Sequence, residues 1–109
     1  MSELGDKQKK FPSMVARLIV HAEALGYALT FGDAFRDIRC DYGHADSLHR
    51  KRIAIDLNLF RLTDANEWEY LTETEDHEPL GAYWKSIGGS WGGDWGDGNH
   101  YSIEHEGVR

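Results

Sequence analysis

The sequence predicts an α+β domain in which two helices pack on a small, mostly antiparallel sheet. Three observations support this prediction. Apolar residues recur at helical spacing near the start of the chain, short runs of strand-forming residues follow, and a second helical stretch lies nearer the end. With 109 residues, 40% of them hydrophobic and 28% charged, the chain suits one globular domain with a modest core.

The first helix is predicted over about residues 12–25, through the apolar residues Met14, Val15, Leu18, Ile19, Ala22 and Leu25. Pro12 suits its first turn, and Gly26 suits the position just past its last turn. Residues 1–10 are polar and predict a flexible N-terminus. The folded domain is therefore expected to span residues 11–109.

Four strands are predicted from runs of strand-forming residues bounded by turn residues, at residues 27–31, 53–60, 68–71 and 100–104. The second run reads best as a central strand with one face in the core. A turn at residues 64–67 joins it to the third strand in a hairpin. A second helix is predicted over residues 78–87, closed by Gly88, with loops at residues 37–48 and 91–98.

Charge and composition exclude several classes of function. The formal net charge is −7, and binding to a phosphate backbone needs lysine and arginine, so we expect no nucleic-acid partner. The single cysteine, Cys40, rules out an internal disulfide. No run approaches the ~20 apolar residues of a membrane span, and no secretory signal is visible, so we expect no membrane insertion.

The first candidate metal ligands are His49 and Asp56. Asp56 is a carboxylate inside the predicted central strand, where burial is costly unless the group is paired or binds a metal. Strand alternation places it on the face opposite the apolar side chains. An ion pair with a cation of the basic residues 50–52 explains the carboxylate equally well, and these two residues alone leave the choice open.

His100 follows a glycine-rich loop and opens the last predicted strand. A lone histidine at a strand edge is more often structural. Two histidines and one carboxylate, with the fourth position left to water, nevertheless form the open ligand set of a catalytic zinc ion. Asp97 lies three residues before His100, where a carboxylate reaches the metal's water as a general base without being a ligand.

Two segments resemble motifs of a known family. Residues 47–56 read Ser47-Leu48-His49-Arg50-Lys51-Arg52-Ile53-Ala54-Ile55-Asp56 and are similar to the signature Ser-x-His-x-x-Gly-x-Ala-x-Asp. That signature belongs to the D-Ala-D-Ala carboxypeptidase and L-alanyl-D-glutamate endopeptidase family, zinc peptidases that share the fold of the hedgehog signalling domain. Residues 91–101 resemble the family's second motif, an acid three residues before the last zinc histidine. The similarity spans about residues 12–105 and implies a hedgehog-like fold.

The resemblance implies a role for each residue that matches a motif position. His49, Asp56 and His100 fall on the family's three zinc ligands, and Asp97 falls on its catalytic acid and base. Arg36 falls where the family keeps an arginine near the scissile carbonyl, which implies that its guanidinium stabilises the oxyanion as charge develops.

Other residues are assigned to the substrate or to the local turn. Ser47 matches the motif serine, for which a role in positioning substrate is implied, and Trp95 is expected to line the substrate cleft beside Trp91. The chain departs from the family where the motif glycine is replaced by Arg52, so the turn into the strand must be built differently.

The aspartate at position 97 resembles the phage endolysin branch, which cuts between L-Ala and D-Glu of the peptidoglycan stem peptide. The resemblance therefore implies a zinc-dependent L-alanyl-D-glutamate endopeptidase. Its small size resembles phage or prophage lysis enzymes, so we expect a monomer. Such an enzyme stays in the host cytoplasm until a pore-forming partner lets it reach the cell wall.

Three alternatives remain open. The first is a D-Ala-D-Ala carboxypeptidase, and the second is a non-catalytic relative that binds wall peptide or another protein. The third is a structural zinc protein whose site is closed by a fourth ligand such as His44 or Cys40. The remaining histidines are not assigned to the site: His77 is predicted in a solvated acidic segment and His105 on the surface.

Overall fold

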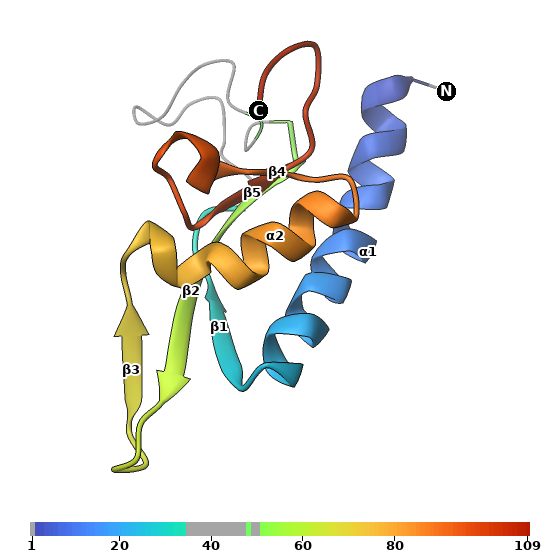
Figure 1. Ribbon diagram of the computed structural model, residues 1–109. Helices are drawn as coiled ribbons and strands as arrows, with labels where there is room; N and C mark the ends of the chain where they lie inside the picture. The colour runs from blue at the N-terminus through green and yellow to red at the C-terminus, as the bar shows by residue number, and fades with distance from the viewer. Residues whose placement is uncertain (1, 35–47, 49–50) are drawn as a thin grey trace.

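The computed structural model describes residues 2–34, 48 and 51–109 (Figure 1). Its elements are α1 (Glu3–Ala24), β1 (Tyr27–Phe31), β2 (Ala54–Leu62), β3 (Trp68–Leu71), the 3-10 turn η1 (Thr74–His77), α2 (Glu78–Ser86), β4 (Ser90–Trp91), the 3-10 turn η2 (Gly92–Trp95) and β5 (His100–Ser102). The predicted α+β class is confirmed, with two helices and five antiparallel strands in the described part of the chain. Residues 37–47 of the loop predicted at residues 37–48 lie outside that part.

The sheet is built around β2, the predicted central strand. β1 pairs with one edge of β2, while β5 pairs with its first half and β3 with its second half. The Asp56 carbonyl accepts from the Gly32 N–H (2.8 Å), and the Asp56 N–H donates to the Asp33 carbonyl (2.7 Å). Because these bonds occupy the β1 side, β5 and β3 share the other edge of β2. Residues 57–58 lie between their two pairing regions.

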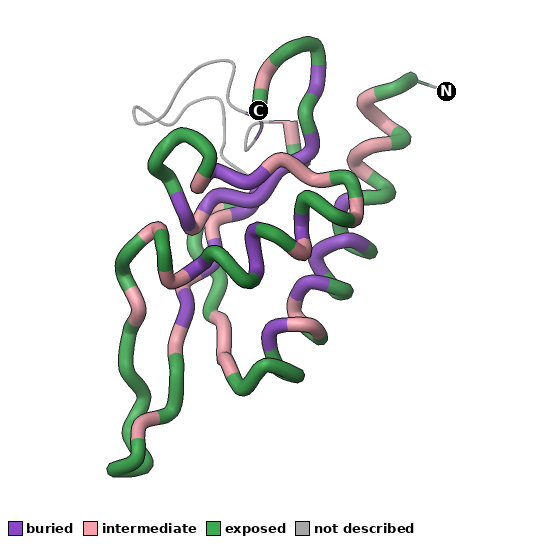
Figure 2. The backbone as a smooth tube through the Cα atoms, viewed as in Figure 1, coloured by how far each residue is buried: buried purple, intermediate pink, exposed green. Residues whose placement is uncertain are grey.

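Alternation along β2 decides which side chains enter the core. Ile55, Leu57 and Leu59 are at most 6% exposed, whereas Asp56 and Asn58 are half-buried on the opposite face. This pattern agrees with the prediction that one face of the strand is apolar and the other carries Asp56. Figure 2 shows buried positions where β2 and β5 pair, above α2 in this view, and exposed positions along the outer hairpin of β2 and β3.

Trp84 of α2 joins the helices to the sheet. Its side chain is fully buried, and its indole N–H donates to the Ser102 carbonyl of β5 at 2.9 Å. Its ring meets Phe11 of α1 and Tyr101 of β5 edge-on, each with centroids 5.9 Å apart. Edge-on aromatic pairs add about 0.5–1.5 kcal/mol to the burial of their area. One side chain therefore holds α1, α2 and β5 in a fixed arrangement.

The first helix begins at Glu3 rather than near Pro12, so the polar segment before Phe11 is helical. The Ser2 hydroxyl caps this helix by accepting the Gly5 N–H at 2.9 Å. Pro12 lies inside the helix instead of in its first turn. A proline there costs a helical hydrogen bond, so contacts with the rest of the fold must offset the loss.

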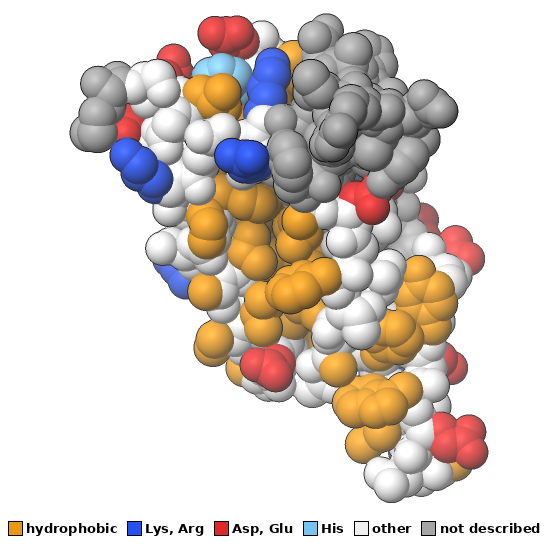
Figure 3. Space-filling view, turned by 180° about the vertical axis from the view of Figure 1, so that it is seen from behind, with side chains coloured by type: hydrophobic (Ala, Val, Ile, Leu, Met, Phe, Trp, Pro, Cys, Tyr) orange, Lys and Arg blue, Asp and Glu red, His pale blue; other side chains and the backbone are white. Residues whose placement is uncertain are grey.

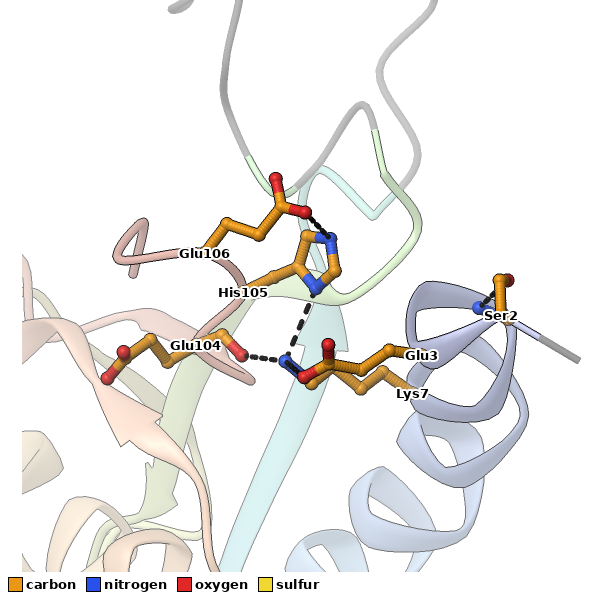
Figure 4. A network of polar contacts seen from close by, with 7 residues as sticks. Ser2, Glu3, Lys7, Glu104, His105 and Glu106 are labelled. Atoms are coloured by element: carbon orange, nitrogen blue, oxygen red, sulfur yellow. Dashed lines mark hydrogen bonds and ion pairs between the residues drawn. The ribbon is translucent and has the colours of Figure 1, made fainter.

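Those contacts come from the first turns of α1. The Lys7 ammonium donates to the Glu104 carbonyl (2.7 Å) and lies 3.3 Å from Nδ1 of His105 (Figure 4). The Gln8 amide donates to the Lys51 carbonyl at 2.8 Å. His105 is 6% exposed, so the prediction that it lies on the surface is wrong. Tertiary bonds to the end of the chain and to the start of β2 therefore extend the helix beyond its apolar stretch.

The surface carries an apolar groove between α1 and the sheet. Its volume is about 400 Å³, and its lining includes Phe11, Val15, Ile19, Phe31 and Ala54. Figure 3 shows hydrophobic side chains gathered on this side of the molecule and on the projecting hairpin. Within the described segments, no helix has the length and apolar character needed to cross a membrane.

Candidate functional site

Asp56 and His100 are direct partners across the β2–β5 pairing. The backbone of Asp56 bonds toward β1, so this is a non-hydrogen-bonded pair, the class in which opposed side chains approach most closely. Nδ1 of His100 lies 3.7 Å from Oδ1 of Asp56, and the two side chains are 9% and 24% exposed. Two predicted metal ligands, far apart along the chain, therefore meet on one face of the sheet.

Asp97 reaches the same region through a tight turn. The His100 N–H donates to the Asp97 carbonyl (3.1 Å), a bond between residues three apart that closes a β-turn. The Asp97 N–H donates to the Gly92 carbonyl at 2.8 Å. Asp97 itself is exposed. Its carboxylate is therefore held at the solvent side of a short loop whose other end is His100.

The close approach of this loop to His100 requires glycine at position 92. A Cβ atom there would lie 2.1 Å from the Asp97 carbonyl oxygen and 2.6 Å from Cβ of His100. Contacts of that length are sterically forbidden, so any other residue would push the loop away from β5. At least one glycine of the predicted glycine-rich loop is therefore required sterically.

The two tryptophans of the loop have different environments. Trp95 is 39% exposed, and its ring centroid lies 5.5 Å from that of His100, a place consistent with a cleft wall. Trp91 is 7% exposed, and its indole N–H donates to the Gly98 carbonyl at 2.7 Å. The expectation that Trp91 also forms a wall is therefore wrong, because its side chain is used inside the fold.

A polar pocket of about 180 Å³ lies beside Asp97. Leu57 and Asn58 of β2 line it at the place where β3 and β5 diverge, and Tyr70, Glu73, His77 and Asp97 are among the other lining residues. Asn58 lies two residues from Asp56 on the same face of β2. Leu57 lies on the core face of β2, so the pocket opens at the gap between β3 and β5 and is lined from both faces of the strand.

His77 lies in this pocket and is bonded to the core. It is 3% exposed, and its Nδ1 lies 2.8 Å from the hydroxyl of Tyr101, the residue after His100. Burial lowers the pKa of His77, while the nearby Asp76 carboxylate acts in the opposite direction. Burial raises the pKa of Tyr101 well above its ordinary value of 10. At neutral pH both groups are therefore uncharged.

The prediction that His77 lies in a solvated acidic segment is wrong, because the side chain is buried. The signal lies in the spacing: His77, Leu80 and Trp84 are three and four residues apart, and all three are buried. Because η1 runs directly into α2, this helical spacing extends back to the histidine. Because its neighbours are acidic, the sequence pattern around His77 looked solvated, although His77 belongs to the buried face of the helix.

The turn into β2 explains how Arg52 replaces a glycine. The Leu48 carbonyl accepts from the N–H groups of both Lys51 and Ile53, each at 3.1 Å. Arg52 has a φ of 62°, the left-handed conformation that a Schellman turn requires and that glycine adopts most readily. Leu48 and Ile53, at the two ends of the turn, are 1% and 0% exposed. The turn keeps the glycine conformation with a bulkier residue.

Several predicted residues lie outside the described part of the chain: Arg36, Ser47 and His49, together with the alternative ligands His44 and Cys40. Their roles stay predictions. Among the described residues, no group of three His, Cys, Asp or Glu side chains is placed to hold a metal ion. The Asp56–His100 pair nevertheless has the chemistry of a divalent-metal site, with an imidazole and a carboxylate on one half-buried surface.

Comparison with known proteins agrees with this geometry. A family model described as D-alanyl-D-alanine carboxypeptidase matches residues 41–103, more than half of the chain, and the match includes Asp56, Asp97 and His100. No curated protein matches the chain. The resemblance seen in the two motifs is confirmed, and the chain belongs to the D-alanyl-D-alanine carboxypeptidase family of peptidases.

Proposed function

We propose that the chain is a zinc-dependent peptidase that hydrolyses the peptidoglycan stem peptide between L-Ala and D-Glu. One observation supports this proposal above all others. Asp56 and His100 face each other at 3.7 Å, and the turn that ends at His100 begins at Asp97, in a chain of a peptidase family. The two proposed ligands therefore face each other, and the proposed acid stands at the start of the turn that ends at one of them.

His49, Asp56 and His100 would hold the zinc ion. When bound, zinc supplies a Lewis acid that acidifies water and polarises a carbonyl group. The family is generally zinc-dependent. The half-buried position of the Asp56–His100 pair limits competition from water, which strengthens electrostatic interactions at this place.

The remaining steps belong to side chains of this chain. Asp97 is exposed at the start of the turn that ends at His100, and it takes the proton from the attacking water as a general base. Arg36 stabilises the negative charge that develops on the carbonyl oxygen. Asp97 then returns the proton to the leaving amine, and Ser47 and Trp95 position the peptide. These four roles rest on the motif match and on the placement of Asp97 and Trp95.

The biological setting follows from the same branch of the family. An aspartate at position 97 favours the phage endolysin group over the carboxypeptidases, which usually carry glutamate there. We therefore propose a phage or prophage lysis enzyme, monomeric, that accumulates in the host cytoplasm. A pore made by a partner protein would then give it access to the wall.

The test compares metal content and products in matched variants. Asp56→Ala should lose bound zinc, because it removes a ligand, whereas Asp97→Asn should keep zinc and lose at least a hundredfold in activity, as expected for a general base worth about 10²–10⁴ in rate. Asp94→Asn is the control, because Asp94 lies in the same loop but bonds to Lys85 at 3.0 Å, away from the site. Normal wall hydrolysis by Asp97→Asn would contradict the mechanism.

A second candidate is favoured by the description of the family model, which names a D-alanyl-D-alanine carboxypeptidase. The two activities release different products from one substrate. A carboxypeptidase releases free D-Ala from the end of the stem peptide, whereas the endopeptidase releases the peptide that begins with D-Glu. Mass spectrometry of digested peptidoglycan separates them, and the absence of any fragment would favour a non-catalytic binder.

A further inference from the structure

The polar pocket beside Asp97 contains a histidine that the proposed mechanism does not use. His77 is 3% exposed, and one nitrogen, Nδ1, contacts the Tyr101 hydroxyl at 2.8 Å. His77 is also one of the residues that line the pocket. Because the ring edge with Nδ1 faces Tyr101 in the core, the opposite edge, with Nε2, is the one left to face the pocket. A buried polar atom that faces an open pocket is suited to a ligand.

The hydrogen bond to Tyr101 determines the tautomer of His77. Tyr101 is fully buried, and its hydroxyl hydrogen needs an acceptor, which Nδ1 of His77 supplies at 2.8 Å. A neutral imidazole carries one hydrogen, so when Nδ1 accepts, the hydrogen is on Nε2. The pocket therefore presents a fixed N–H donor on a ring that the core holds in place.

The charges around the pocket select the acceptor that this donor takes. Glu73 and Asp97 line the same pocket and are both exposed. The negative charge of two residues that line this pocket would repel a free carboxylate, whereas a neutral carbonyl oxygen accepts the hydrogen bond without that penalty. The site is therefore built for a peptide carbonyl within a chain rather than for a free carboxyl end.

We propose that His77 is a substrate-binding residue whose Nε2–H donates to a carbonyl oxygen of the peptide beside the scissile bond. This inference rests on the proposed peptidase function, because Asp97 at the pocket wall is its general base. Tyr101 is the positioning residue that keeps the hydrogen of His77 on the nitrogen that faces the pocket. The pair favours an internal peptide segment and so favours endopeptidase action over removal of a terminal residue.

The experiment measures kcat and KM on a soluble disaccharide–pentapeptide that contains both the L-Ala–D-Glu and the D-Ala–D-Ala bonds. Three variants are compared with the wild type: His77→Phe, Tyr101→Phe and the double variant. Both single variants break the same His–Tyr hydrogen bond, but only His77→Phe removes Nε2. Thermal unfolding of each variant reports the structural cost separately from the kinetics.

We expect His77→Phe to raise KM about tenfold, the value of one hydrogen bond of about 1.4 kcal/mol, with kcat within about twofold of the wild type. Tyr101→Phe should raise KM several-fold less than His77→Phe does, because the imidazole ring of His77 and its Nε2 remain. The double variant should unfold at a higher temperature than His77→Phe, since no buried hydroxyl lacks a partner, yet keep the raised KM.

The outcomes separate the inference from the function on which it rests. Equal KM values for the two single variants, or a KM that recovers in the double variant together with its stability, would show that His77 is structural and overturn the inference alone. If the wild type cleaves neither bond, the proposed function falls first and the inference with it.

Discussion

At the scale of single residues, the candidate site depends on side chains that strand register places opposite each other. Asp56 and His100 lie 3.7 Å apart because they are partners in a non-hydrogen-bonded pair. A shift of register by one residue would move either side chain to the other face. The geometry of the pair is therefore a property of the β2–β5 pairing as much as of the two residues.

Arg52 has a left-handed backbone conformation, which is unfavourable for a residue with a Cβ atom. Its φ of 62° costs a residue with a Cβ about 1–2 kcal/mol, and glycine avoids that cost. We expect Arg52→Gly to be more stable than Arg52→Ala by about 1 kcal/mol, since both remove the side chain and only glycine relieves the backbone. Urea unfolding at one pH measures the difference, and equal midpoints for the two variants would argue against strain at this turn.

At the scale of elements, α1 is extended at its start by bonds to distant parts of the chain. Lys7 reaches the Glu104 carbonyl at 2.7 Å, and Gln8 reaches the Lys51 carbonyl at 2.8 Å. An isolated polar segment of this length would gain little from its own helical hydrogen bonds. The first turns of α1 are therefore held by the segment after β5 and by the turn before β2.

The Lys7 contact gives a prediction for this element. Lys7→Ala should lower the free energy of unfolding by about 1–2 kcal/mol, because a charged donor to a carbonyl is lost from a site that is 22% exposed. Lys10→Ala on the exposed side of the same helix is the control and should change it by less than about 0.5 kcal/mol. Chemical denaturation of the two variants checks this, and an equal loss in both would point to helix propensity instead.

At the scale of the whole molecule, the layers are joined by buried aromatic and polar contacts. Trp84 bonds to the Ser102 carbonyl and packs on Phe11, while His77 bonds to Tyr101 in the neighbouring part of the core. These contacts connect both helices to β5, the strand that carries His100. The stability of the domain and the position of the candidate ligand are therefore coupled.

The burial of His77 makes the stability of the domain depend on pH. Burial lowers the pKa of His77 from its ordinary 6.5, so between the folded-state pKa and 6.5 the unfolded chain binds more protons than the folded one. Stability is therefore complete above pH 6.5 and falls as the pH is lowered through the folded-state pKa. Thermal unfolding from pH 7.5 downward should show a smaller loss for the His77→Phe, Tyr101→Phe double variant than for the wild type, and parallel losses would contradict the assignment.

The strands and the site were predictable to different degrees. The bounds of β1 and β3 coincide with the predicted runs, because turn residues and strand-forming residues are local signals. The predicted face of Asp56 also agrees with the structure, since alternation follows from strand geometry alone. The burial of His105 was not predictable in this way, because its partner Lys7 lies far along the chain, whereas the burial of His77 left a local signal in its spacing to Leu80 and Trp84.

The sequence by itself determined the fold class, the family and the residues that match its motifs, because periodicity and motif spacing are written along the chain. Only the tertiary structure decided that Asp56 and His100 stand opposite each other, that α1 starts at Glu3, and that His77 lies in a pocket beside Asp97. The physical reason is that strand register, burial and long-range hydrogen bonds are set by which segments meet, and the free energy of that choice belongs to the assembled core.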